Sequence, residues 1–365
     1  MIWPWVGFLG LIFALLALDL GVFHSRARIV TMKESLAWSA VWISLGLGFS
    51  GVVYIAYEAQ WCGLGTQIDL VDGEYNDGAT ATEKYLTGYV VEKSLSVDNI
   101  FVIAMIFGFF SIPAQHQHRV LFWGIVGALL LRGVMIAIGA TLLHRFAWLL
   151  YVFGAFLIFT ALKMMFIRTN HSDPDMNVFA RFARWFFPVT RELYDEHFLV
   201  RAQPRLAAEK GTLATYDPAM ARVAPGTWML TPLFLALIVV ETTDVIFAVD
   251  SIPAIFAITA DPFLVFTSNV FAILGLRALY FALAGMLDKF CYLKFALAQV
   301  LLVVGLKMFF AETLKDWLGK HFNLYLLVVI FSILTAGVLA SLFAQRPCPP
   351  LVSEKESTRL PTGDD

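Results

Sequence analysis

Residues 241–281 read ETTDVIFAVDSIPAIFAITADPFLVFTSNVFAILGLRALYF, a largely apolar stretch that carries a few isolated charges. A membrane-spanning helix needs about 20 mostly apolar residues, so we expect two spans here, over 228–257 and 263–285. The charges are the unusual feature, because a charged side chain near the bilayer centre costs about 2.5–3.5 kcal/mol. The stretch therefore predicts a helical membrane protein with a functional polar site inside the bilayer.

The composition of the whole chain supports this class. The 365 residues are 59% hydrophobic and 15% charged, whereas soluble domains carry about 25% charged residues. This composition excludes a disordered chain, a nucleic-acid-binding protein and an ordinary soluble enzyme. The three cysteines are far apart, which fits neither a disulfide framework nor a zinc site. The chain has no phosphate-binding loop and no zincin motif, so we expect neither an enzyme nor a tightly bound cofactor.

Hydropathy predicts an all-α polytopic membrane protein, with a single transmembrane domain over 1–345. About nine segments are long and apolar enough to span a bilayer. The predicted spans are 3–23, 36–57, 86–110, 119–143, 146–167, 228–257, 263–285, 291–310 and 323–344.

The flanking charges predict the orientation, because Lys and Arg concentrate in cytosolic loops. Residues 58–85 hold six acids and one Lys, whereas residues 168–227 hold eight Lys or Arg. This asymmetry predicts an N-terminus outside and a C-terminus inside. The 168–227 loop is then cytosolic, and its apolar residues between 178 and 186 predict a short helix lying in the membrane interface. We expect the tail over 346–365 to be disordered and cytosolic.

An internal repeat divides the membrane domain. Segments 144–166 and 288–310 align without a gap and share seven of 23 residues. Upstream, the acid pairs Glu92/Asp98 and Asp244/Asp250 have the same six-residue spacing. We therefore predict two three-helix repeats, over about 86–167 and 228–310. The orientation above makes them inverted, an architecture that places a transporter's site at the repeat interface near the bilayer midplane.

The charged residues inside the spans define the candidate site. Two Arg and Lys93 cannot neutralise five acids, and the excess suits a bound divalent cation or titrating protons. All the candidate ligands are oxygens, and no Cys or His is near them in the sequence, so we expect a hard cation such as Mn²⁺, Mg²⁺ or Ca²⁺. The candidate ligands are Glu92, Asp98, Asn99, Glu241, Asp244, Asp250 and Ser251, and the charge-compensating residues are Arg132 and Arg277.

The spacing of the acids leaves two possibilities open. Residues six apart on a straight helix point about 120° from each other. Asp244 and Asp250 therefore do not share a face, and the same holds for Glu92 and Asp98. Either each span is broken near its acids, or the acids contact different neighbours. Glu241 and Asp244 are three residues apart and do share a face.

The same residues resemble a known family. The stretch 241–281 is similar to the signature of the TerC family of bacterial integral membrane proteins. EKSLSVDNIFV at 92–102 resembles the family's first acidic segment, and LDLGVF at 18–23 its N-terminal one. The resemblance implies a multi-pass protein of the bacterial inner membrane. It also implies a metal-ion transporter, most often linked to manganese export, with a historical link to tellurite resistance.

The leading hypothesis is therefore a secondary exporter of Mn²⁺ that uses the membrane acids as ligands. A proton-coupled exporter of a small cationic or zwitterionic molecule is an alternative. Another is a membrane scaffold that loads metal onto exported proteins, with the acid-rich 58–85 loop as its partner-binding surface. An intramembrane aspartyl protease fits poorly, because Asp98 and Asp250 lack the neighbouring GxGD glycines.

Overall fold

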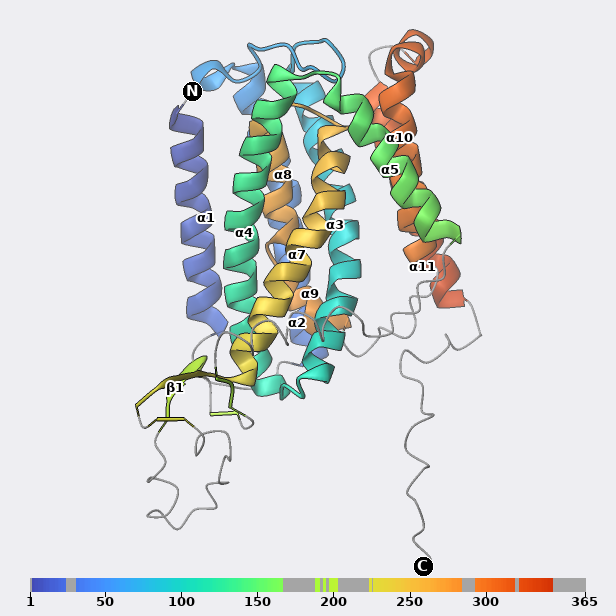
Figure 1. The fold of residues 1–365 in the computed structure, drawn as a ribbon. Helices are drawn as coiled ribbons and strands as arrows, with labels where there is room; N and C mark the ends of the chain where they lie inside the picture. Colours follow the sequence, from blue (N-terminus) through green and yellow to red (C-terminus); the bar gives the residue numbers. More distant parts are fainter. Residues whose placement is uncertain are drawn as a thin grey trace, which may run out of the picture.

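The computed structural model describes residues 2–23, 31–166, 188–190, 193–194, 197–202, 223–224, 226–283, 293–318 and 322–343. These residues form a bundle of long helices that run between two ends, with a small β-sheet below one end (Figure 1). The first helices are α1 (Ile2–Phe23), α2 (Met32–Glu58), α3 (Gly78–Phe109), α4 (Ala114–Arg145) and α5 (Leu149–Phe166). The later helices are α7 (Pro232–Phe256), α8 (Pro262–Ile273), α9 (Leu276–Leu283), α10 (Leu293–Leu318) and α11 (Phe322–Phe343).

Each predicted span coincides with one helix, except that 263–285 forms the consecutive pair α8 and α9. In the described part of the chain, seven segments are long and apolar enough to cross a membrane. Helix α3 carries more charge than these seven, and the apolar part of α10, Phe295–Phe310, is shorter. The prediction of an all-α polytopic membrane protein is confirmed.

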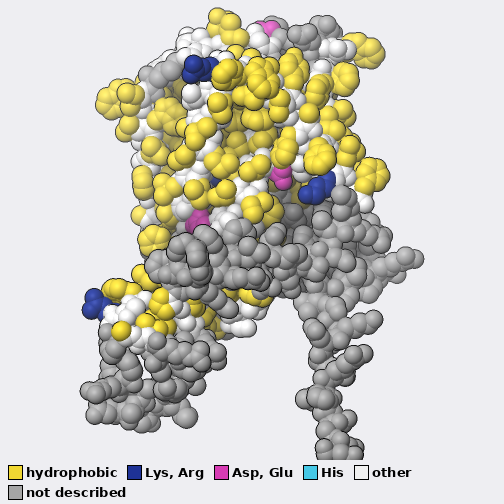
Figure 2. Space-filling model, in the orientation of Figure 1, with side chains coloured by type: hydrophobic (Ala, Val, Ile, Leu, Met, Phe, Trp, Pro, Cys, Tyr) yellow, Lys and Arg dark blue, Asp and Glu magenta, His cyan; other side chains and the backbone are white. Residues whose placement is uncertain are grey.

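The surface of the bundle is apolar, and part of its interior is polar. Large hydrophobic side chains such as Trp3, Leu130 and Phe331 are exposed, while Glu92 and Arg132 are buried. Figure 2 shows hydrophobic side chains over most of the described part of the visible face. Water penalises exposed apolar side chains, whereas the hydrocarbon core of a membrane does not. A helix can lie in that core because its backbone polar groups are satisfied internally.

Each long helix of the first predicted repeat packs on a helix of the second. Helix α3 packs on α8, α4 packs on α7, and α5 packs on α10. The first pair meets at Gly88 and Ser268, and the second at Gly124 and Val240. Small residues at such crossings let membrane helices approach closely. Helices α3 and α7 run in opposite directions (Figure 1), while the predicted inverted repeat stays a prediction.

Residues 59–77, which we call the cap, lie between α2 and α3 at the end of the bundle opposite the β-sheet and include the short 3₁₀ helix η1 (Trp61–Gly63). Asp69 of the cap is 3% exposed. It accepts hydrogen bonds from Lys84 Nζ at 2.8 Å and from the backbone N–H of Ala260 at 2.9 Å, and Thr259 also donates to it. Burial favours the neutral acid, but Lys84, Thr259 and Ala260 outweigh it and hold the pKa of Asp69 below its ordinary value.

The sheet at the opposite end is small. Strand β1 (Leu199–Arg201) pairs antiparallel with β2 (Trp228–Leu230), and Val200 lies opposite Met229. Strand β2 leads directly into α7. The predicted interfacial helix around 178–186 and the tail over 346–365 lie outside the described residues.

Candidate functional site

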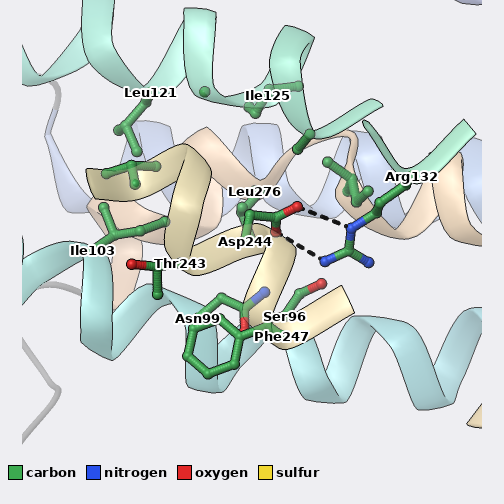
Figure 3. Close-up of a pocket in the computed structure, with 14 residues that line it drawn as sticks. Ser96, Asn99, Ile103, Leu121, Ile125, Arg132, Thr243, Asp244, Phe247 and Leu276 are labelled. Atoms are coloured by element: carbon green, nitrogen blue, oxygen red, sulfur yellow. Dashed lines mark hydrogen bonds and ion pairs between the residues drawn. The ribbon is translucent and has the colours of Figure 1, made fainter. Parts of the chain in front are cut away.

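Arg132 of α4 lies at the meeting point of four helices. Its Nε and Nη2 donate to the two carboxylate oxygens of Asp244 on α7, at 3.2 and 3.0 Å, and Nη1 donates to Glu92 on α3. The same Nη1 lies 3.4 Å from the hydroxyl of Ser251 and 3.3 Å from the amide oxygen of Asn269 on α8. Figure 3 shows the guanidinium facing the carboxylate of Asp244. The sequence thus brings acids from both predicted repeats onto one cation.

Glu92, Arg132 and Asp244 form a group that we call the triad. The side chain of Glu92 is 0% exposed and that of Arg132 is 2% exposed, while that of Asp244 is 16% exposed. Two carboxylates and one guanidinium leave the ionised triad with a net negative charge. Buried ions are expensive to hold unless they are paired and hydrogen-bonded. Arg132 therefore offsets a charge that the bundle could not otherwise keep buried.

A narrow cavity reaches the triad. It is lined by polar side chains of α3 and α7, including Ser96, Asn99 and Thr243, and by apolar side chains such as Ile103 and Leu121 (Figure 3). Its volume is about 30 Å³, and one water needs about 10–15 Å³ by the same measure. The space therefore fits a few waters or one partly dehydrated ion.

The cavity lies in the half of the bundle that carries the sheet. Helices α4 and α7 both begin at that end (Figure 1), and they line the cavity with 121–132 and 240–247. This is the end that the flanking Lys and Arg residues predict to be cytosolic.

Glu241 adds a further carboxylate one turn before Asp244 on α7. A methyl group added at Gly127 of α4 would overlap the Glu241 carboxylate, so this acid lies directly against a helix backbone. Its Oε2 is buried and has no hydrogen-bond partner among the described residues. Next to the site, a buried acceptor oxygen is therefore left unsatisfied by the described part of the chain, which is unusual.

Gly127→Ala is expected to weaken function at the site by displacing the Glu241 carboxylate. The alanine methyl group would occupy the space that the carboxylate fills now. Gly133→Ala on the same helix is the matched control, because its methyl group would meet only the ring of Phe266, at 3.3 Å. Because the sequence predicts a transporter, ion-flux assays on both variants check this prediction, and equal loss in the two would contradict it.

The remaining predicted site residues lie apart from the triad or line the cavity. Asp250 accepts a hydrogen bond from Thr160 of α5 at 3.3 Å. Arg277 pairs with Asp19 of α1 at 2.8 Å, and not with a triad acid. Asn99 lines the cavity. The side chain of Asp98 lies outside the described residues.

Helices α3 and α7 are continuous past their acids. The expected alternatives were a broken helix or acids that contact different neighbours. The second holds for Asp244 and Asp250, because Asp244 contacts Arg132 and Asp250 contacts Thr160. Among the described residues, no group of three or more His, Cys, Asp or Glu is close enough to hold a metal ion. Arg132 takes the central position between Glu92 and Asp244 instead.

Two residues at or beside the site, Asn269 and Lys93, are not among the site residues that the sequence predicts. Asn269 is 1% exposed and binds Arg132, and the only sequence signal for it is an amide inside the apolar run 262–273. The ammonium group of Lys93 binds the backbone carbonyl oxygens of Ala272 in α8 and of Leu274, which lies between α8 and α9. A lysine inside a span is a signal for such a contact, although it does not name the partner.

The amino-acid sequence of the chain is similar to those of known membrane proteins. The family described as integral membrane protein TerC family matches residues 77–347. A relative named "Uncharacterized membrane protein STKORF319", from Myxococcus xanthus, is 44% identical over 94% of this chain and 93% of its own. Another, "Putative membrane-bound redox modulator Alx" from Escherichia coli (strain K12), is 43% identical over 84% of this chain and 86% of its own. No solved structure matches the chain.

Proposed function

The chain belongs to the TerC family of integral membrane proteins, and from this premise we propose that it exports a hard divalent cation, with Mn²⁺ as the favoured ion. The proposal places the chain in the bacterial inner membrane, with the cavity open toward the cytosolic side. The chain acts as a transporter and not as an enzyme. The Mn²⁺ ion is its cargo and not a resident cofactor.

The observation that carries the proposal is the position of Arg132 between Glu92 and Asp244. A guanidinium held by the buried carboxylate of Glu92 and the partly buried carboxylate of Asp244 occupies the place that a metal cation would take. A divalent ion between the same two carboxylates would leave the pair neutral. The ion and Arg132 therefore compete for one set of oxygens, which gives the site an empty state and a loaded state.

The donor chemistry supports a hard cation. The residues that line the cavity include carboxylate, amide and hydroxyl groups, with no Cys or His among them. Oxygen donors suit Mn²⁺, Mg²⁺ and Ca²⁺ better than copper or zinc. Mn²⁺ is also redox-active, so its export would connect this chain to the redox role named for the Escherichia coli relative without requiring a thiol at the site.

Two alternative functions receive less support. A small organic molecule would need more room than the cavity offers. A partner-binding role for the 58–85 loop would draw on its exposed acids, but Asp69 and Asp72 both bind Lys84, at 2.8 and 2.7 Å. Much of the charge of that loop is thus used to hold the cap on the bundle.

Ion flux into liposomes tests the proposed function. The purified protein is reconstituted with a metal-sensitive and a pH-sensitive dye, and Mn²⁺, Mg²⁺, Ca²⁺ and Zn²⁺ are added in turn. We expect Mn²⁺ flux in the native protein, and none above empty liposomes for Glu92→Gln and Asp244→Asn. Glu74→Gln on the exposed part of the cap is the control and should keep full flux. Folded protein that moves none of these metals would refute the proposal.

A further inference from the structure

Helix α8 breaks deep inside a membrane span. It ends at Ile273, Leu274 is extended with φ −57° and ψ 133°, and α9 begins at Leu276. Gly275 has φ +80°, which disfavours any other residue, and a methyl group on it would lie 2.5 Å from Trp42 of α2. The break is therefore fixed by the sequence, and it leaves carbonyl groups without helical partners in a dry environment.

The ammonium group of Lys93 binds this break. Its Nζ donates to the backbone carbonyl oxygens of Ala272 at 2.9 Å and Leu274 at 3.3 Å. In the described part of the chain Lys93 makes no ion pair within 4.0 Å, so the carbonyl groups are its principal partners. A cation held by backbone carbonyl oxygens at an unwound helix is the geometry by which transporters coordinate transported cations.

The break adjoins the site described above. Ile273, between the two carbonyl groups, lines the cavity, as does Leu276 after the break. Asn269, one turn before the break on α8, binds Arg132. Lys93 directly follows Glu92 of the triad. Two internal cations, Arg132 and Lys93, therefore bind oxygen atoms of the short segment 269–274 beside one cavity.

We propose that the carbonyl oxygens of Ala272 and Leu274 are further ligands on the cation path, and that Lys93 occupies them while no ion is bound. The inference rests on the proposed function. It adds Lys93 to Arg132 as a second side chain whose positive charge competes with the ion. Lys93 leaves these oxygens when the ion arrives, and its return helps to expel the ion. Lys93 is thus a positioning residue that weakens binding so that release can follow.

Mn²⁺ binding to purified protein, measured by equilibrium dialysis, tests the role of Lys93. Lys93→Met removes both the charge and the hydrogen-bond donors. Lys93→Gln removes the charge but keeps an N–H donor for the carbonyl oxygens, and Lys93→Arg keeps both. We expect the Met and Gln variants to bind Mn²⁺ about tenfold more tightly, because a competing positive charge has gone. The Arg variant should bind like the native protein.

The Gln variant separates this role from simple capping of α8. If Lys93 only satisfies carbonyl groups, Lys93→Gln will bind Mn²⁺ like the native protein, and that result would overturn the inference. The Gln variant also covers the case in which Lys93→Met fails to fold. If the native protein binds and transports Mn²⁺ but Lys93→Gln binds it with the native affinity, only the role of Lys93 is refuted and the proposed function stands. Native protein that neither binds nor moves Mn²⁺ would remove both.

Discussion

Replacing Arg132 with methionine is expected to destabilise the metal-free protein and to make its stability depend on Mn²⁺. Removing one partner of a buried ion pair typically costs about 3–5 kcal/mol, because the other charge is left uncompensated. Here Glu92 and Asp244 would both lose the guanidinium that they share. Mn²⁺ in the vacated place would restore the balance, and an ion at about 100 times its Kd contributes about 2.7 kcal/mol.

Thermal unfolding of the Arg132 variant, in chelator and then in Mn²⁺, measures both effects. Arg277→Met is the matched control, because Arg277 is 3% exposed and pairs with Asp19 at 2.8 Å. We expect both variants to lose stability in chelator, and Arg132→Met to recover more of it in Mn²⁺ than Arg277→Met, because no guanidinium competes with the ion in the first variant. Equal recovery in the two variants, or recovery in neither, would contradict the competition between Arg132 and the ion.

The second large effect is expected at the cap. Lys84 is 0% exposed and binds Asp69 at 2.8 Å, Asp72 at 2.7 Å and the amide oxygen of Asn76 at 2.7 Å. Lys84→Met leaves Asp69 buried without its cation, which we expect to cost about 3–5 kcal/mol. Chemical unfolding of the native and variant proteins at neutral pH measures the loss.

The pH dependence of this loss has a definite sign. In the native protein the pKa of Asp69 is lowered, so its contribution is present above the ordinary pKa and is lost as the pH falls through the lowered pKa. Without Lys84, burial dominates and raises that pKa, so the folded variant takes up a proton that the unfolded chain does not. The stability of Lys84→Met should therefore rise as the pH falls from 7 toward 5.

The double variant Asp69→Asn with Lys84→Met isolates the ion pair. Asparagine carries no charge, so this variant should recover part of the lost stability and should show no such rise with falling pH. A Lys84→Met protein as stable as the native one would contradict the account of the cap. So would an identical pH profile in the single and double variants.

The fold was largely predictable because hydropathy is a strong local signal in a membrane protein. Each predicted span became a helix or, for 263–285, a pair of helices. The break at Leu274 and Gly275 was not predicted, since a single glycine in an apolar run looks like any other small residue of a membrane helix. The sequence drew attention to breaks near the acids of α3 and α7, and both helices are continuous there.

The site was predictable in its chemistry but only partly in its geometry. Charges inside spans singled out Glu92, Arg132 and Asp244, which the structure brings together. Which face of a helix meets which neighbour depends on tertiary packing, so the contact of Asp250 with Thr160 could not be read from spacing. The pairing of Arg277 with Asp19 is of the same kind, because it joins residues 258 positions apart.

The position of bound Mn²⁺ shows whether the ion and Arg132 compete for the same carboxylates. Anomalous X-ray scattering at the manganese edge would locate the ion in crystals of the native protein grown with Mn²⁺. We expect an ion about 2.0–2.6 Å from carboxylate oxygens of Glu92 and Asp244, the range for hard cations, with the guanidinium of Arg132 withdrawn from both. A bound ion elsewhere, with Arg132 still between the two carboxylates, would contradict it.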